Sequence, residues 1–529
     1  MYDGQSVTIP LGTGGLYTDD PDTITPSSKL SRAVNISLLR GKIEKDFGSR
    51  KWNNEALPDK VLHIVDWWPN TVTQRFVAVC GDGKTYRFRH SHYSELITPD
   101  TTAPGVLSTT GYITSTEGGA ESAGSDKKLF IFTGNNEIQV VTGDETTRTN
   151  IEKPAADWSG NNQPFKGIIH RGYLFAFGNE NAPSRIYRSS STDHEDFTTL
   201  PWTDNIFPGE GEMLMDAISF KGKLMVFKFP VGIYILNDAD ATPGNWYFQK
   251  FNESVGTVSP FAIWEVLNDL LIANEHGTVT SLSAIDAYGD VESADLFNNL
   301  RVDDAIDQEM NLTGGNQRRA IYYGAKKMAY VTYQSLAGIA NDRIVQVKFG
   351  SRTPEITISD KDQPNCLALR KDIFGVKRPF YGANDGFIYQ MDTVDRDVAG
   401  VAYRGEFQTP NMDFGNLDPR LAETSKNFDF LEVIYEPTGY AKITIEYYID
   451  GRYIDTRQID LRGFSTLGVI KTDEDRMSAL CPMSKRIPIM GQGRRISVRI
   501  YNDGLLENFK ITGLKIYFKI QGEQQTVRE

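Results

Sequence analysis

Cysteine is scarce in this sequence of 529 residues. The three cysteines, Cys80, Cys366 and Cys481, lie far apart and form neither a Cys-x-x-Cys pair nor the ligand spacing of a zinc site. A disulfide framework is therefore not expected. We interpret the cysteines as small buried side chains of a protein that is assembled in a reducing cytoplasm.

Long apolar runs are also missing. No stretch approaches the roughly 18 apolar residues that a membrane helix needs. The N-terminal residues Met1 to Gln5 lack the basic and apolar regions of a signal peptide. We therefore expect no membrane segment.

Positive charge is in deficit, because 56 lysines and arginines face 69 aspartates and glutamates, for a formal net charge of -13. A protein that grips nucleic-acid phosphates over a broad surface has the opposite balance. A negatively charged wall would instead repel DNA and let it pass in solvent.

Catalytic and metal-binding motifs are few and incomplete. The stretch Ser191–Phe197 is similar to the Asp-box turn of sialidase propellers but lacks its glycine. Within it, His194 and Glu195 could form an acid–base pair, although no third group is visible beside them. His90 and His92 could bind a metal only with another ligand. We predict no catalytic residue, no cofactor and no metal.

Turn residues and aromatics are plentiful, with 47 glycines and 11% aromatic residues, which is typical of an all-β protein. From about residue 60, short apolar runs pair across Gly, Asn or Asp turns, as in β-hairpins. Seven such hairpins recur, at 76–80 with 84–88, 129–132 with 137–141, 173–177 with 184–188, 224–227 with 233–236, 270–273 with 278–282, 329–333 with 343–348, and 379–381 with 387–391. Several runs are apolar on both faces, so sheets must cover both sides. This pattern predicts a β-propeller over residues 59–404, with six to eight blades and seven favoured.

The two ends of the chain lack the repeat. Residues 1–58 show little regular pattern, and we expect an extended N-terminal arm that supplies an edge strand elsewhere. Residues 405–529 contain runs such as 430–435 and 441–448, in which apolar and polar residues alternate. Alternation indicates one buried and one wet face, so a C-terminal β-sandwich-like domain is predicted.

The densest group of basic residues lies in this last segment. It comprises Lys485, Arg486, Arg494, Arg495 and Arg499. The group is either a docking surface for an acidic partner or DNA, or an ordinary solubilising surface.

Several stretches, taken in chain order, resemble one protein family. They are Ala33–Asn35, Arg40–Lys42 and Gly48 in the arm, Arg185–Phe197, Leu224–Leu236, Gly256–Gly277, and Pro488–Tyr517. This ordered set is similar to the tail hub or nozzle proteins of short-tailed bacteriophages (podoviruses), also described as DNA-stabilisation or tail accessory proteins. The sequence departs from the family at Lys45–Gly48, where the family is more basic.

The resemblance implies a non-enzymatic virion protein that forms a homohexameric ring below the head-to-tail adaptor. The ring would enclose the DNA exit channel, retain the packaged genome and conduct it during ejection without specific DNA binding. Its neighbours would be the adaptor ring, a tail fibre or tailspike, and a tail needle or plug, in a virion tail assembled in the host cytoplasm. We further expect residues 1–55 to contact a neighbouring subunit or the adaptor. The alternatives are a glycan-binding or glycan-cleaving propeller for host recognition, and a monomeric propeller scaffold.

Overall fold

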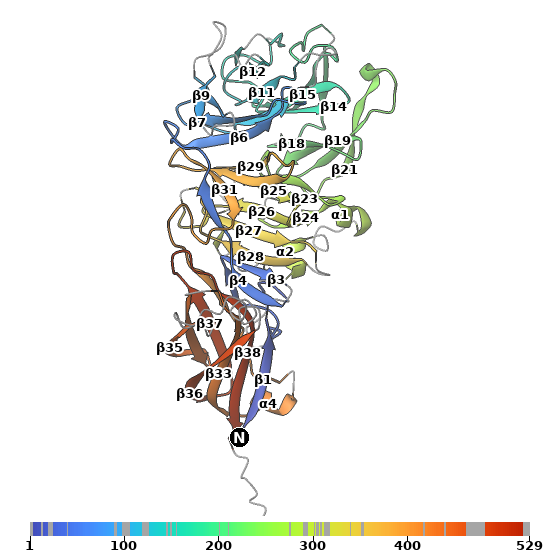
Figure 1. Cartoon of the computed structure of the whole chain (residues 1–529). Helices are drawn as coiled ribbons and strands as arrows, with labels where there is room; N and C mark the ends of the chain where they lie inside the picture. Colours follow the sequence, from blue (N-terminus) through green and yellow to red (C-terminus); the bar gives the residue numbers. More distant parts are fainter. Residues whose placement is uncertain are drawn as a thin grey trace, which may run out of the picture.

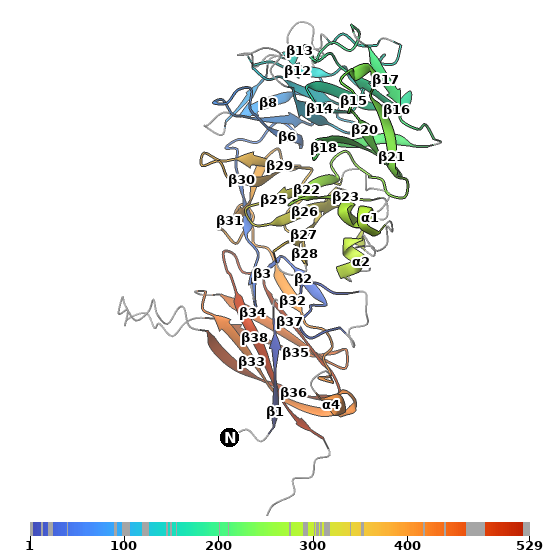
Figure 2. The ribbon, with the colours of Figure 1, turned by 90° about the vertical axis from the view of Figure 1, so that its right-hand side faces the viewer.

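The structure, a computed structural model, is an elongated all-β molecule with a propeller at one end and a β-sandwich at the other (Figures 1 and 2). It describes all residues except 1–3, 12–13, 19–24, 40, 89–92, 98–105, 119–125, 144–146, 149–150, 155, 200, 210, 275–276, 289–294, 301, 303–305, 307–308, 312–317, 339, 351–353, 416–417, 439–440, 462–481 and 522–529.

Seven antiparallel meanders form the propeller, and each contains one of the seven predicted hairpins as its second and third strands. Blade 1 comprises β6 (Val61–Trp67), β7 (Arg75–Cys80), β8 (Thr85–Phe88) and β9 (Ser94–Leu96). Blade 2 comprises β10 (Thr114–Glu117), β11 (Leu129–Phe132), β12 (Gln139–Val141) and β13 (Thr147–Arg148). Blade 3 comprises β14 (Lys166–His170), β15 (Tyr173–Asn179), β16 (Ala182–Arg188) and β17 (Trp202–Asn205). Blade 4 comprises β18 (Met213–Phe220), β19 (Lys223–Phe229), β20 (Ile233–Asn237) and β21 (Tyr247–Asn252), with the short η1 (Pro243–Asn245) before its last strand.

The remaining blades are less regular. Blade 5 has three strands among the described residues, β22 (Ile263–Val266), β23 (Asp269–Ala273) and β24 (Val279–Ser281), and is followed by α1 (Leu282–Tyr288) and α2 (Leu296–Leu300). Blade 6 comprises β25 (Ala320–Tyr323), β26 (Met328–Tyr333), β27 (Arg343–Lys348) and β28 (Glu355–Ser359). Blade 7 comprises β29 (Cys366–Lys371), β30 (Lys377–Gly382), β31 (Ile388–Thr393) and, from the N-terminal arm, β5 (Gly48–Lys51).

Apolar cores between neighbouring blades close the ring. Phe132 of blade 2 packs with Leu174 of blade 3, for example, and Phe76 of blade 1 packs with Phe380 of blade 7. Every residue of β11 is buried, because this strand has a sheet on each side. Corresponding clusters join every other pair of adjacent blades. The prediction of a β-propeller with seven blades is confirmed.

The arm supplies the last strand of this ring. β5 pairs with β31, with Lys51 opposite Tyr389. The next residue, Trp52, donates its backbone N–H to the carbonyl of Ile388 at 2.8 Å and buries its ring against Phe76 and Phe380. The arm thus supplies the last strand of blade 7, as expected, and Trp52 after this strand joins blade 7 to blade 1.

The C-terminal part forms two packed sheets, which confirms the predicted β-sandwich-like domain. One sheet contains β3 (Ile36–Leu39), β4 (Lys42–Lys45), β38 (Lys510–Ile520), β33 (Lys426–Glu436) and β36 (Met483–Gly493), with β1 (Gln5–Pro10) also beside β38. The other contains β2 (Arg32–Val34), β32 (Gly405–Gln408), β37 (Ile496–Asn502), β34 (Lys442–Ile449) and β35 (Arg452–Asp460). The short helix α4 (Pro419–Glu423) precedes β33. Alternate residues such as Leu431, Ile445 and Ile516 fill the space between the sheets.

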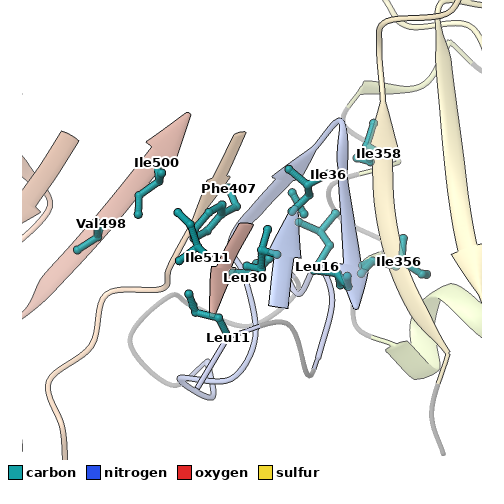
Figure 3. Packing of buried hydrophobic residues seen from close by; sticks show 14 of the residues in the cluster. Leu11, Leu16, Leu30, Ile36, Ile356, Ile358, Phe407, Val498, Ile500 and Ile511 are labelled. Carbon is teal, nitrogen blue, oxygen red and sulfur yellow. The ribbon is translucent and has the colours of Figure 1, made fainter. Parts of the chain in front are cut away.

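Propeller and sandwich share one sheet of nine strands, because β2 of the arm lies between β28 of blade 6 and β32 of the sandwich. Figure 3 shows the apolar side chains at this junction. Leu16, Leu30 and Ile36 of the arm lie between Ile356 and Ile358 of β28 on one side and Phe407 of β32 on the other. All these side chains are buried, so the junction has its own core.

The described strands of the arm therefore all pair within their own chain. The expected contact of residues 1–55 with a neighbouring subunit or the adaptor stays a prediction. Removing residues 1–55 would open blade 7 and divide the nine-stranded sheet. In the described part of the chain, no helix is long and apolar enough to cross a membrane.

Candidate functional site at the propeller axis

The first strand of each blade lies innermost. β6 contacts β29 and β10, β14 contacts β10 and β18, and β25 contacts β22 and β29. Seven side chains near the beginnings of these strands, one per blade, form what we call the axial cluster. Its members are His63, Ser115, Lys166, Asp216, Phe261, Arg319 and Cys366.

An ion pair links blades 3 and 4 in this cluster. The Lys166 Nζ lies 2.9 Å from Asp216 Oδ1 and donates to the carbonyl of Pro260 at 2.6 Å. The Asp216 side chain is only 5% exposed, and this burial raises the pKa of its carboxyl group to about 6, although Lys166 opposes the shift. Asp216 is thus mostly ionised near neutral pH, but it titrates well above the ordinary pH range of an aspartate.

A neutral histidine links blades 1 and 2. His63 Nε2 lies 2.8 Å from Ser115 Oγ, whereas His63 Nδ1 is buried without a hydrogen-bond partner. Burial, and then the positive charges of Arg319 and Lys166, lower the pKa of His63 to about 3. The imidazole therefore carries no charge at physiological pH.

Arg319 brings a second cation to the cluster. Its Cζ lies 3.7 Å from the centre of the Phe261 ring, a cation–π contact, and its NH2 group donates to the carbonyl of Leu62 at 3.2 Å. Burial lowers the pKa of Arg319 to about 10 and raises the pKa of the Cys366 thiol to about 11. The thiol stays protonated at neutral pH and provides no negative charge for the guanidinium.

The axial cluster differs from the two-carboxylate site that is usual for glycoside hydrolases. Glycoside hydrolysis ordinarily uses two carboxyl groups on either side of the bond that breaks. Among its described members the axial cluster has one carboxylate, Asp216, and that carboxylate is bound to Lys166. In the described part of the chain, no group of three or more His, Cys, Asp or Glu residues could hold a metal ion. The cluster instead offers hydrogen-bond donors and positive charge.

Of the residues singled out from the sequence, Cys366 belongs to the axial cluster, and the other described ones lie elsewhere. His194 Nε2 bonds to the carbonyl of Gly172 at 2.9 Å, and Glu195 pairs with Lys128 at 2.6 Å, so each has its own structural partner. His90, His92 and Cys481 lie outside the described residues. Cys80 and Cys366 are buried and free, as expected.

The basic group of the C-terminal segment is dispersed in space. Lys485 and Arg486 belong to β36 in one sheet, whereas Arg499 belongs to β37 in the other sheet. Arg486 donates to the Tyr517 hydroxyl at 2.9 Å, and Arg499 pairs with Glu406 at 2.6 Å.

The two remaining members of this group, Arg494 and Arg495, lie in the turn between the two strands. Their backbone N–H groups donate to Asp450. The five residues do not form one patch, and their docking role stays a prediction.

The axial cluster was not found from the sequence, because each member is a single residue separated from the next by about one repeat. The available signal was a polar or aromatic residue at the start of each first strand, such as Lys166 before Gly167-Ile168-Ile169. The runs before the hairpins were recognised as part of the repeat only in blades 4 and 5, at Met213–Phe220 and Val258–Trp264, so the seven strand beginnings were not aligned.

Comparisons with known proteins give only distant likenesses. No protein-family model matches the chain, and no curated sequence matches it either. Three solved structures are similar in part. A quinoprotein alcohol dehydrogenase-like protein from Bacteroides thetaiotaomicron has 13% identity and a TM-score of 0.36 over 57% of this chain and 66% of that chain. An exo-β-1,3-galactanase from Phanerochaete chrysosporium has 9% identity and a TM-score of 0.27 over 90% and 100%. Raptor from Chaetomium thermophilum has 11% identity and a TM-score of 0.40 over 66% and 29%. At these scores the likeness supports no function for this chain, and the β-propeller assignment rests on its own sheets.

Proposed function

We propose that the protein is a structural component of a short phage tail, a homohexameric nozzle or hub ring below the adaptor that encloses the DNA exit channel. The observation that carries the proposal is the nine-stranded sheet through propeller and sandwich. A ring that must withstand the pressure of packaged DNA needs subunits without a hinge, and a shared sheet with its own core meets this need. A soluble monomeric enzyme has no such requirement.

Charge supports the same role. Six copies of a chain with a net charge of -13 would surround the channel with negative charge. The basic residues of the C-terminal segment are spread over two sheets and the turn between them, and two of them have partners nearby, Arg499 with Glu406 and Arg486 with Tyr517. A lumen lined with acidic and neutral side chains would let DNA slide past, because tight binding depends on contacts between cations and phosphates. The ring would retain and conduct the genome, next to an adaptor, a fibre or tailspike, and a needle or plug.

Electron microscopy of the purified full-length chain tests the proposal. We expect rings with six-fold symmetry and a central opening, and native mass spectrometry should give the mass of six 59.3 kDa chains. Assembly could require the adaptor, so the sample is also imaged after mixing with portal–adaptor complexes of short-tailed phages. A chain that stays monomeric in both conditions would refute the ring.

The rival function, a glycan-binding or glycan-cleaving propeller, is tested with the same preparation. Glycan-array binding and release of reducing sugar from surface polysaccharides would both be measured. The Asp216→Asn variant is the matched control, because Asp216 is the only axial carboxylate among the described members. Hydrolysis that this substitution abolishes would favour the rival.

A further inference from the structure

We propose that the axial cluster holds a small monovalent inorganic anion of halide size, bound between the guanidinium of Arg319 and the imidazole of His63. The site lies at the propeller axis, inside one subunit, and it does not depend on the proposed assembly.

The charges of the cluster do not balance. Lys166 is neutralised by Asp216, but Arg319 has no carboxylate within 4.0 Å among the described residues. His63 and Cys366 are neutral, so one positive charge is left over in a region where Arg319 is 7% exposed. A buried ion without a counter-ion is costly, because it loses its hydration without gaining an opposite charge. One bound monovalent anion would restore neutrality.

Two hydrogen-bond donors are unused beside this charge. Arg319 Nε is buried and has no partner. The direction of the hydrogen bond between His63 Nε2 and Ser115 Oγ depends on the tautomer of His63, and a bound anion selects the tautomer in which Ser115 donates. The His63 proton is then on Nδ1, a second buried atom without a partner. Both side chains pack against Phe261, at 3.7 Å from Cζ of Arg319 and 6.1 Å between the two ring centres. A water molecule could accept these hydrogen bonds, but it would leave the charge uncompensated.

The size of the anion follows from burial. His63 is 8% exposed and Arg319 is 7% exposed, so an organic acid or a nucleotide has no access to the two donors. Three members of the cluster, Ser115, Lys166 and Phe261, are partly exposed, so the cluster keeps a contact with solvent through which a small ion could enter.

Arg188 provides an internal comparison. It is also buried, and its Nε also lacks a partner, but its guanidinium carbon lies 4.8, 5.0 and 5.4 Å from the rings of Tyr173, Trp202 and Trp246. Three aromatic faces stabilise this cation, whereas Arg319 has one. We therefore expect an anion at Arg319 and none at Arg188.

Thermal unfolding of the full chain tests the site. Wild type, Arg319→Met and Arg188→Met are each titrated with sodium bromide at constant ionic strength, with sodium gluconate as the bulky balancing salt. Wild type and Arg188→Met should gain roughly 2 °C in Tm when bromide reaches about thirty times its Kd, because binding to the folded state alone stabilises it. Arg319→Met should show no gain in Tm. Bromide that binds at the protein surface should change the Tm of all three proteins equally, so the difference between wild type and Arg319→Met reports the axial site alone.

A second measurement does not depend on the variants. Crystals of the wild-type protein soaked in sodium bromide should give an anomalous bromine peak within hydrogen-bond distance of Arg319 Nε and His63 Nδ1. An equal rise of Tm in wild type and Arg319→Met, or the absence of a bromine peak at this position, would overturn the proposal. If Arg319→Met does not fold, the diffraction result alone decides.

Discussion

Val34 in β2 pairs in parallel with Ile358 in β28, and this pair makes blade 6 and the sandwich parts of one sheet. On its other edge, β2 is antiparallel to β32, with Val34 opposite Glu406. A hinge between the domains would have to break these backbone hydrogen bonds and expose the junction core. Propeller and sandwich are therefore expected to move as one body.

The residue after Val34 tests this junction. Asn35 is 1% exposed with φ of 52°, a backbone conformation that asparagine tolerates better than alanine. Its side chain donates to the carbonyl of Arg404 at 2.7 Å and accepts from the backbone N–H of Asp360 at 3.0 Å. Asn35→Ala should lower the free energy of unfolding by about 3 kcal/mol, because it strands these buried partners. Urea denaturation followed by tryptophan fluorescence measures the loss. The exposed Asn384→Ala serves as control, and equal effects of the two substitutions would contradict the role of Asn35.

Closure of the propeller ring depends on Trp52. Its ring lies 5.2 Å from Phe76 and 6.0 Å from Phe380, between the first and last blades. Trp52→Ala should cost about 4 kcal/mol, since it removes a large buried aromatic side chain and leaves a cavity. The exposed Phe374→Ala, at 83% exposure, should change stability by less than about 0.5 kcal/mol.

Deletion of residues 1–55 should lower the Tm of the propeller more than Trp52→Ala does, because it removes the strand β5 as well as Trp52. A propeller that keeps its Tm after this deletion would show that β5 is dispensable.

Asp216 should make stability depend on pH. Burial raises the pKa of its carboxyl group to about 6 in the folded chain, above the ordinary value of 3.8. The folded state thus binds this proton more tightly than the unfolded state does. Its contribution to stability is complete below about pH 4 and is lost as the pH rises through 6, by about 3 kcal/mol in total.

The measurement is the difference in unfolding free energy between wild type and Asp216→Asn from pH 4 to 7. The difference in unfolding free energy should fall as the pH rises from 4 to 7 and then become constant. The slope is the test, and the magnitude of the difference at any one pH is not. Asn384→Ala, which changes an exposed residue and removes no ionisable group, should give a difference without this slope. A flat difference for Asp216→Asn would mean that the carboxylate is well solvated.

Glu406 holds three arginines on the outer face of the sandwich. Its carboxylate pairs with Arg32, with Arg404 at 2.8 Å and with Arg499 at 2.6 Å. Burial opposes ionisation of Glu406, but Arg32 and Arg499 outweigh it and lower the pKa of this carboxyl group. Glu406→Gln should cost about 2 kcal/mol, because three like charges remain together, and less in 1 M salt, which screens partly exposed charges. Glu265→Gln on the propeller surface is the control. A loss that does not depend on salt would argue against a repulsive origin.

The architecture of the repeat was accessible from the sequence. Short runs such as Leu129–Phe132 and Leu224–Phe227 are apolar at every position, and a strand with this pattern must have a sheet on each side. Seven copies joined by tight turns leave few arrangements other than a propeller. Alternation in β34, where Ile443, Ile445 and Tyr447 are buried, was equally informative for the sandwich. These patterns are local, so they can be recognised without knowing what the strand contacts.

The partners of the arm and the members of the axial cluster were decided only by the tertiary structure. Nothing in Arg32–Val34 indicates that this short strand enters the gap between β28 and β32, since its pairs lie more than 300 residues away. Likewise, Lys166, Asp216 and Arg319 are ordinary polar residues until the closed ring brings seven strand beginnings to one axis. Backbone pairing between distant strands depends on shape and register, and the balance of buried charge depends on which side chains meet. Both are properties of the folded ring rather than of any local stretch of sequence.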